Sequence, residues 1–210
     1  MEPFRSVTGI AVPFDRINVD TDQIIPARFI MKPRDYDYST LLFHDLRFGL
    51  SAQPDFPLDA PVYRGARIMV TAANFGCGSA REQAAYALQD FGIRALIGPS
   101  FGDIFRTNCV KNGILLAQVD AEVSAALCAA LLAEPGAAVS LDLEKQIIVD
   151  PAQRTIAFRI SDGDKAQLLS GKDDITRTLE HEARMDAFER EYIRDATWIR
   201  PPVGAVIEGG

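Results

Sequence analysis

The hydrophobic and polar positions in the middle of the chain change repeatedly between the period of a strand and that of a helix. Short apolar runs each precede a longer stretch with helical spacing, which glycine or proline then terminates. The pattern predicts strands at 67–71, 93–97 and 114–119, and helices at 80–91, 101–112 and 121–133. Strands and helices that alternate in this way form parallel βαβ units with right-handed crossovers.

The two ends of the chain follow other patterns. A short strand is expected at 6–13, and beyond Gly136 the alternation is typical of antiparallel strands at 139–143, 146–149 and 155–160. Residues 173–194 indicate one charged amphipathic helix, whose candidate inward positions are Ile175, Leu179, Met185, Phe188 and Ile193. The sequence therefore predicts an α/β fold with a parallel βαβαβ core, additional antiparallel strands and a C-terminal helix. We expect a single domain over residues 1–200 and a flexible tail over 201–210.

Residues 14–66 resist assignment because prolines and scattered aromatic residues interrupt both periods. Within this segment, residues 37–47 have helical spacing at Leu41, Leu42 and Leu46. Long irregular segments in a compact domain are commonly functional or mobile. The segment is therefore a candidate for part of a functional site.

Charge and composition narrow the classes of function. The 210 residues include 22 Lys and Arg against 29 Asp and Glu, and the formal net charge is −7. This balance argues against a duplex nucleic-acid partner, because such proteins carry a basic face. The longest strongly apolar run, at 125–133, is too short to span a bilayer, and the first residues lack the layout of a secretory signal. We expect a cytoplasmic protein without a membrane partner.

The cysteines and histidines give no sign of a metal site in this chain. Cys77, Cys109 and Cys128 are odd in number and widely spaced, which disfavours a disulfide framework and a cluster held by this chain alone. His44 and His181 are far apart and lack the spacing of metal ligands. We therefore expect no metal and no cofactor bound by this chain alone.

Residues 74–83 carry the clearest chemical signal. They follow a predicted strand and open a predicted helix, and their glycines permit a tight turn. The backbone amides of Gly76, Gly78 and Ala80 are expected to form an anion site, with Ser79 at the helix terminus and Arg81 as a planar fork for a carboxylate. The alternative is a glycine-rich turn in which Ser79 only caps the helix. The dinucleotide, Walker and hydrolase-elbow motifs are all absent.

Several motifs occur together in one order along the chain. They are Asn18–Pro26, Asn74–Glu82, Pro99–Phe105 with Asn108 and Lys111–Gly113, and Gly171–Ile175 with Thr178–Leu179. Together they resemble the small subunit of 3-isopropylmalate dehydratase, which corresponds to the swivelling β/β/α domain of the aconitase superfamily. The resemblance covers nearly the whole chain.

This resemblance implies a hydro-lyase that is active only with a separate large subunit, which carries a [4Fe-4S] cluster. The substrate is a small hydroxy-diacid, by default the isopropylmalates of leucine biosynthesis. Ser79 matches the serine whose alkoxide removes a proton, and Arg81 and Asp22 match residues at the substrate pocket. Lys32 and Arg34 fall where the superfamily places a basic substrate contact, although solvated surface charge explains them equally well.

Two departures from the family pattern leave the substrate open. Ala80 and Gln83 replace a second serine and a histidine, and residues 31–47 differ in the loop that helps the family to choose the substrate side chain. One alternative is therefore a paralogous enzyme for another hydroxy-diacid of the citramalate or malate/maleate type. A second alternative is a non-catalytic binding module that keeps the fold and the anion pocket.

Overall fold

The structure is a computed structural model that describes residues 1–50, 52–196 and 198. It divides into two units, Met1–Gly171 and Lys172–Gly210, and each is described here by itself. That residues 1–200 act as one domain stays a prediction. The tail expected over 201–210 lies outside the described residues.

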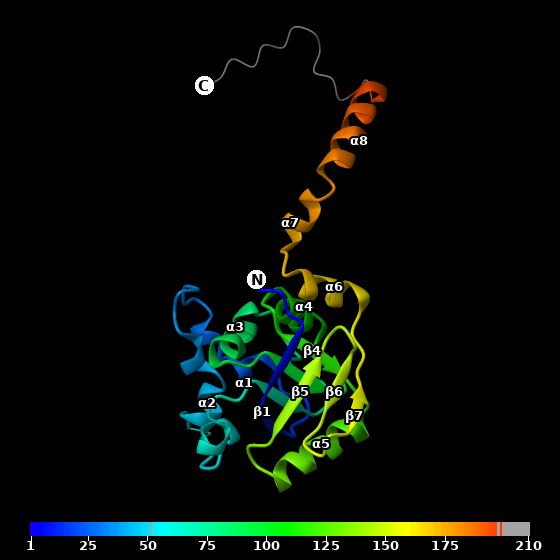
Figure 1. Cartoon of the computed structure of the whole chain (residues 1–210). Helices are drawn as coiled ribbons and strands as arrows, with labels where there is room; N and C mark the ends of the chain where they lie inside the picture. Colours follow the sequence, from blue (N-terminus) through cyan, green and yellow to red (C-terminus); the bar gives the residue numbers. More distant parts are fainter. Residues whose placement is uncertain (51, 197, 199–210) are drawn as a thin grey trace. The chain divides into compact units, whose positions relative to one another are not determined.

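The first unit is built on one seven-stranded sheet with the strand order β4-β3-β2-β1-β5-β6-β7 (Figure 1). The parallel strands are β1 (Ser6–Phe14), β2 (Ile68–Thr71), β3 (Ala95–Gly98) and β4 (Leu115–Gln118). The antiparallel strands are β5 (Ala138–Asp142), β6 (Ile147–Val149) and β7 (Thr155–Ala157). The predicted combination of a parallel core with added antiparallel strands is confirmed.

Strand β1 joins the two parts of the sheet. Its second half pairs in parallel with β2, with Ala11 opposite Ile68, whereas its first half pairs antiparallel with β5, with Val7 opposite Leu141. A single nine-residue strand therefore fixes the position of the antiparallel strands relative to the parallel core.

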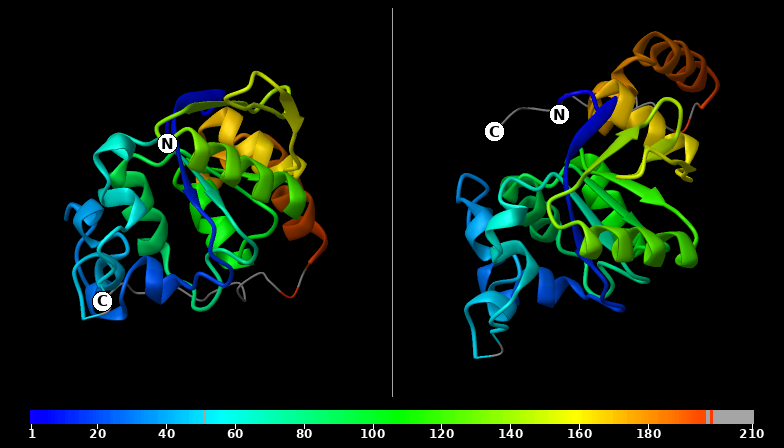
Figure 2. Two further views of the ribbon diagram at one scale, coloured as in Figure 1. Left: turned by 90° about the horizontal axis from the view of Figure 1, so that it is seen from below. Right: turned by 60° about the horizontal axis from the view of Figure 1, so that its bottom comes forward.

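Helices cover both faces of the parallel strands (Figure 2). Alternate strand residues such as Met69 and Leu96 share one core cluster with α3 (Glu82–Phe91) and α4 (Asp103–Lys111). The intervening residues, such as Val70 and Ile97, share a second cluster with α5 (Ala121–Ala133). Because side chains alternate between the faces of a strand, fully apolar strands of this kind require cover on both sides.

Residues 15–67 form a layer of short elements rather than an open loop. The described elements include α1 (Thr21–Ile24), the 3-10 turn η1 (Ala27–Phe29), η2 (Tyr38–Leu41) and α2 (His44–Arg47). The helix expected over 37–47 is broken at Phe43, whose φ of 52° lies in the left-handed region. The ring of Phe43 packs 4.8 Å from that of Phe14 and 5.4 Å from that of Phe56. Aromatic packing thus decides the break, and local propensity does not.

The C-terminal part contains one helix that the hydrophobic pattern did not reveal. It is α6 (Asp162–Ser170), capped by the Ser161 hydroxyl, which accepts a hydrogen bond of 3.1 Å from the Asp164 amide. The glycine in its first turn obscured the helical signal. In the second unit, the single helix expected over 173–194 is instead two helices, α7 (Asp174–Leu179) and α8 (Glu182–Asp195). The prediction that apolar side chains face inward there is wrong, because all five are exposed, by 45 to 73%.

A pair of glycine substitutions tests the packing of the turn after β2. Gly65 and Gly76 share a φ of +74°, but a Cβ at Gly65 meets nothing within 4 Å, whereas one at Gly76 overlaps the ring of Phe105. Gly65→Ala should lower the free energy of unfolding by about 1 kcal/mol through backbone strain alone. Gly76→Ala should lower it by roughly 2 kcal/mol more, because Phe105 is buried and must move. Urea unfolding of both variants measures the difference, and equal losses would contradict the described packing.

Candidate functional site

The carboxyl ends of the parallel strands bring three connecting segments together at one edge of the sheet. The segment after β2 pairs with the segment after β1 through a bridge between Cys77 and Asp20, and with the segment after β3 through a bridge between Phe75 and Phe101. The Gly102 amide donates to the Phe75 carbonyl at 2.9 Å. Ligand sites of open α/β sheets form at this edge, so the predicted site residues lie where the fold favours a site.

Hydrogen bonds from the segment after β1 hold the turn that contains Ser79. The amides of Gly76 and Cys77 both donate to the Val19 carbonyl, at 2.7 and 3.2 Å. In the other direction, the Thr21 amide donates to the Cys77 carbonyl at 2.9 Å, and the Thr21 hydroxyl donates to the Ser79 carbonyl at 3.0 Å. Thr21 is buried and Ser79 is exposed. Hydrogen bonds from the buried Thr21 therefore hold the backbone at Ser79, and Ser79 itself is exposed to solvent.

The glycines of this region are required by close backbone approach. Gly76 has a φ of +74° and sits directly against Phe105. A Cβ at Gly102 would overlap the carbonyl oxygen of Gly76, so the segments after β2 and β3 touch through their backbones. No other residue type fits these two positions without a shift of the chain.

Ser79 is not at the helix terminus, which corrects the sequence-based expectation. Helix α3 begins at Glu82, and its N-cap residue is Arg81 in an extended conformation. The Arg81 side chain makes no capping hydrogen bond to the helix. Ser79 lies three residues before the first helical residue, so the alternative in which it caps the helix is wrong. The Gly76 amide is also taken by Val19, so it is not free for an anion. The amides of Gly78 and Ala80 make no hydrogen bond to other described residues.

Arg81 and Asp22 lie together beside this turn. Nη1 of Arg81 donates to Oδ1 of Asp22 and lies 3.5 Å from the Ile25 carbonyl oxygen. The hydrogen bond from Arg81 lowers the pKa of Asp22 below its ordinary value. The Arg81 side chain is 14% exposed, whereas that of Asp22 is 55% exposed. The ion pair thus orients the Arg81 guanidinium, and Arg81 follows Ser79 by two residues in the sequence.

Arg34 and Lys32 have other partners in the structure. The Arg34 guanidinium forms two 3.0 Å bonds to the Asp90 carboxylate, in the last turn of α3, and its centre lies 4.4 Å from the ring centroid of Tyr86. At 1.5 Å per residue, Asp90 is about 13 Å along α3 from Arg81. The Lys32 ammonium lies 4.8 Å from the ring centroid of Tyr36. The structure joins the turn that contains Ser79 to Asp22 and Arg81, and it places the Arg34 guanidinium at the far end of α3.

Sequence reasoning did not assign a structural role to two residues that shape the site. Thr21 belongs to the Asn18–Pro26 motif and lies inside a capping box in which Asp20 and Gln23 bond each other's backbone amides. That Asp-x-x-Gln signature was readable and marks the start of α1. Gln83 donates from Nε2 to the Ile30 carbonyl at 3.0 Å and so connects α3 to the segment before residue 31. Nothing in the sequence indicated that partner.

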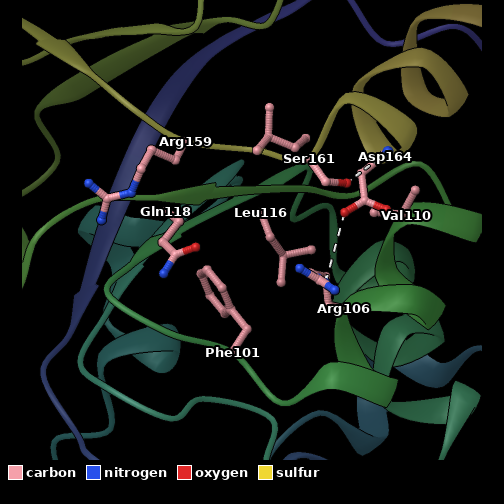
Figure 3. A pocket seen from close by; sticks show the side chains of 9 residues that line it. Phe101, Arg106, Val110, Leu116, Gln118, Arg159, Ser161 and Asp164 are labelled. Carbon is pink, nitrogen blue, oxygen red and sulfur yellow. Dashed lines mark hydrogen bonds and ion pairs between the residues drawn. The ribbon is translucent and has the colours of Figure 1, made fainter.

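A separate cavity of about 210 Å³ lies near the carboxyl end of β4 (Figure 3). Phe101, Leu116 and Gln118 line it together with Arg106 and Asp164, whose Nε and Oδ2 atoms are 3.8 Å apart. None of the predicted site residues lines this cavity. It therefore adds nothing to the chemistry of the Ser79 turn.

The cysteines do not converge on one point. Cys109 and Cys128 belong to different core clusters, and burial raises the pKa of the Cys109 thiol and raises that of Cys128 to about 11. Cys77 is half-buried in the turn. Within residues 1–50, 52–196 and 198, no three histidine, cysteine or acidic side chains are grouped as metal ligands. The donor set described here therefore does not fit a four-iron cluster.

The pairing of Asp22 with Arg81 predicts a pH-dependent contribution to stability. Because the folded-state pKa of Asp22 is lowered, the pair stabilises the fold at pH values above the unfolded pKa, and this stabilisation is lost as the pH falls through the folded pKa. Asp22→Asn should be less stable than the parent at neutral pH by under about 1 kcal/mol, because the carboxylate is largely exposed. Urea unfolding across the acid range should show this difference vanish.

The double variant Asp22→Asn/Arg81→Gln supplies the control. Its stability at neutral pH should equal that of Arg81→Gln alone, because the partner of Asp22 is already gone. A difference between Asp22→Asn and the parent that persists unchanged in acid would contradict the pairing.

Comparisons with known proteins identify the family. A family model described as the aconitase C-terminal domain matches residues 1–122. The chain is 44% identical over 209 residues to the 3-isopropylmalate dehydratase small subunit of Magnetococcus marinus, covering 94% of this chain and 98% of that protein. It is 42% identical over 202 residues to the small subunit of Psychromonas ingrahamii, covering 95% and 99%.

A solved structure shows the same fold. The crystal structure of 3-isopropylmalate dehydratase (LeuD) from Methanocaldococcus jannaschii superimposes with a TM-score of 0.63 at 26% identity, covering 87% of this chain and 98% of that one. Family model, full-length relatives and structure all indicate one family. The chain therefore belongs to the 3-isopropylmalate dehydratase small subunits, which have the fold of the aconitase C-terminal domain.

Proposed function

We propose that this chain is the small subunit of a hydro-lyase that interconverts 2-isopropylmalate and 3-isopropylmalate, by dehydration and rehydration, in leucine biosynthesis. The observation that carries the proposal is that the exposed Ser79, two residues before Arg81, lies on a turn whose backbone is held by Val19 and Thr21. The names of the full-length relatives supply the reaction and the pathway.

Arg81 is proposed to bind a carboxylate of the substrate. The contacts that it makes with Asp22 and Ile25 both use Nη1, which leaves Nη2 and Nε to meet a carboxylate as a fork. Asp22 holds the guanidinium in one orientation, so little side-chain entropy is lost when the substrate binds. In this proposal Asp22 acts at the pocket through Arg81.

Ser79 is proposed to remove the proton next to that carboxylate. A serine hydroxyl serves as a base only where its anion is stabilised. In this proposal the support comes from the Arg81 charge and from the amides of Gly78 and Ala80, because α3 begins three residues after Ser79. The returning proton reaches the neighbouring carbon when water is added again, so one side chain serves both directions of the reaction.

The large subunit completes the site in this proposal. A [4Fe-4S] cluster held by that subunit would supply Lewis acidity for the leaving hydroxyl. The Ser79 turn is exposed in this chain and so accessible to a partner. Among the residues with described positions, none belongs to a helix that is both long and apolar enough to cross a bilayer. We place the assembled enzyme in the cytoplasm.

A second candidate, an enzyme for a related hydroxy-diacid, is favoured by Gln83. Its side chain anchors the Ile30 carbonyl, directly before the segment 31–37. The family resemblance expects a histidine at this position, so the segment is held here by a different group. Citramalate and malate are the natural competitors in an assay.

The test is anaerobic reconstitution with the cognate large subunit, followed by absorbance of the unsaturated diacid formed from 3-isopropylmalate. Ser79→Ala should lower kcat by about 10²- to 10⁴-fold with little change in KM, because a general base is lost. Arg81→Gln should raise KM as well as lower kcat. Ser6→Ala, which changes an exposed serine at the start of β1, is the matched control and should retain full activity.

The same assay separates the candidates. Turnover of citramalate or malate without turnover of 3-isopropylmalate would move the function to the second candidate. A stable complex with an intact cluster and no turnover of any of these diacids would contradict both candidates. Full activity in Ser79→Ala would contradict the role of Ser79 as the base.

A further inference from the structure

The segment between Ile30 and Tyr38 is bonded to α3 at three points. Gln83 donates to the Ile30 carbonyl at 3.0 Å, Arg34 reaches the last turn of the helix, and the Tyr38 amide donates to Oδ2 of Asp90 at 3.2 Å. Residues 31–37 are all exposed, and we refer to this segment as the strap. A run of exposed residues with fixed ends and a fixed middle has few conformations available to it.

Arg34 makes the strongest of these contacts. Its guanidinium bonds both oxygens of the Asp90 carboxylate at 3.0 Å and the Gln89 side-chain oxygen at 3.0 Å, while its central carbon Cζ lies 4.4 Å from the Tyr86 ring centroid. Only arginine combines a bidentate fork with stacking on an aromatic face. The Asp90 side chain is only 19% exposed, so this ion pair is less screened than most surface pairs.

The Asp90 carboxylate binds both Arg34, in the strap, and Tyr38, directly after it. The oxygen that accepts from Arg34 Nη1 also accepts from the Tyr38 amide. The buried Tyr38 hydroxyl then donates to the Lys32 carbonyl at 2.6 Å. The Asp90 carboxylate thus connects α3 to both the middle and the end of the strap.

Helix α3 also positions the carboxylate-binding arginine. Arg81 precedes its first residue and lies 3.5 Å from the Ile25 carbonyl, and Gln83, two residues later, bonds Ile30. The strap therefore begins beside Arg81. Met31, at the start of the strap, exposes 89% of its surface and offers an apolar contact at that position.

We propose that Arg34 is a positioning residue, which together with Asp90 clamps the strap against α3 and so presents a preformed wall beside Arg81. Arg34 acts on substrate affinity through the strap and does not contact the substrate itself. The effect on affinity rests on the proposed function, whereas the clamp itself does not.

The decisive variant is Asp90→Asn, because it releases the clamp and leaves Arg34 in place. Arg34→Gln and Asp90→Asn should each raise KM for 3-isopropylmalate about three- to tenfold, with kcat within about twofold of the parent. Arg34→Lys should not restore KM, because lysine is a point charge without a fork. If Arg34→Gln raises KM while Asp90→Asn leaves it unchanged, Arg34 contacts the substrate directly and the proposal is overturned.

Hydrogen exchange of the chain alone provides a readout that does not depend on activity. Amides of residues 31–38 should exchange faster in Arg34→Gln and in Asp90→Asn, and no faster still in the double variant. Arg159→Gln, which removes a 2.9 Å ion pair with Asp120 after β4, is the matched control and should leave the strap unchanged.

The two readouts separate failure of the clamp from failure of the proposed function. Unchanged exchange in both clamp variants would overturn the proposal whatever the activity shows. Faster exchange together with no turnover in the parent complex would support the clamp and contradict the proposed reaction.

Discussion

The backbone pairing between the segments after β1 and β2 is the constraint on which the candidate site depends. The glycines of this turn have no side chains that could hold its conformation. Its backbone amides and carbonyls therefore require hydrogen-bond partners where they are buried. Val19 and Thr21 supply those partners to Gly76, Cys77 and Ser79. Because β1 and β2 are adjacent parallel strands, their carboxyl ends deliver the two segments to one place. The sheet topology thus sets the position of Ser79.

Helix α3 extends this arrangement to the substrate-facing side. Arg81 stands before its first residue, Gln83 lies in its first turn and Asp90 in its last. Through these residues the helix orients the guanidinium and ties down the segment from Ile30 to Tyr38. A rigid helix therefore provides one frame for both the proposed carboxylate contact and the strap. This is the kind of support that a site needs when it is completed by a second chain.

The sequence was most informative where local signals and tertiary packing agree. Helix α5 has the predicted bounds, because Asp120 precedes it and Pro135 follows it, and its alanines and leucines favour a helix. Phe43 shows the opposite case: helical spacing continues through it, but packing against Phe14 forces a left-handed backbone. Packing partners that are distant in sequence leave no local signal.

The same contrast between local signals and distant packing partners applies to the candidate site. The motif at residues 74–83 identified Ser79 and Arg81, because glycine spacing and charge are local properties. The sequence predicts that α3 begins at residue 80, two residues before its observed start, because Arg81 at the N-cap has no favoured capping chemistry. The expectation that the helix terminus stabilises Ser79 fails for the same reason. Position in the sequence made Arg34 a candidate substrate contact, with solvated surface charge as an equal alternative, whereas Asp90, 56 residues later, binds its guanidinium. Only the fold reveals such a partner.

The most direct test of this account is a comparison of Thr21→Val with Thr21→Ser in the reconstituted enzyme. The buried Thr21 side chain donates from its hydroxyl to the Ser79 carbonyl. Thr21→Val keeps the shape and removes the donor, so kcat should fall by about tenfold or more while the chain stays folded, because the Ser79 backbone loses its support. Thr21→Ser keeps the donor and should retain most of the activity. Equal kcat in Thr21→Val and the parent would contradict the claim that this pairing positions Ser79.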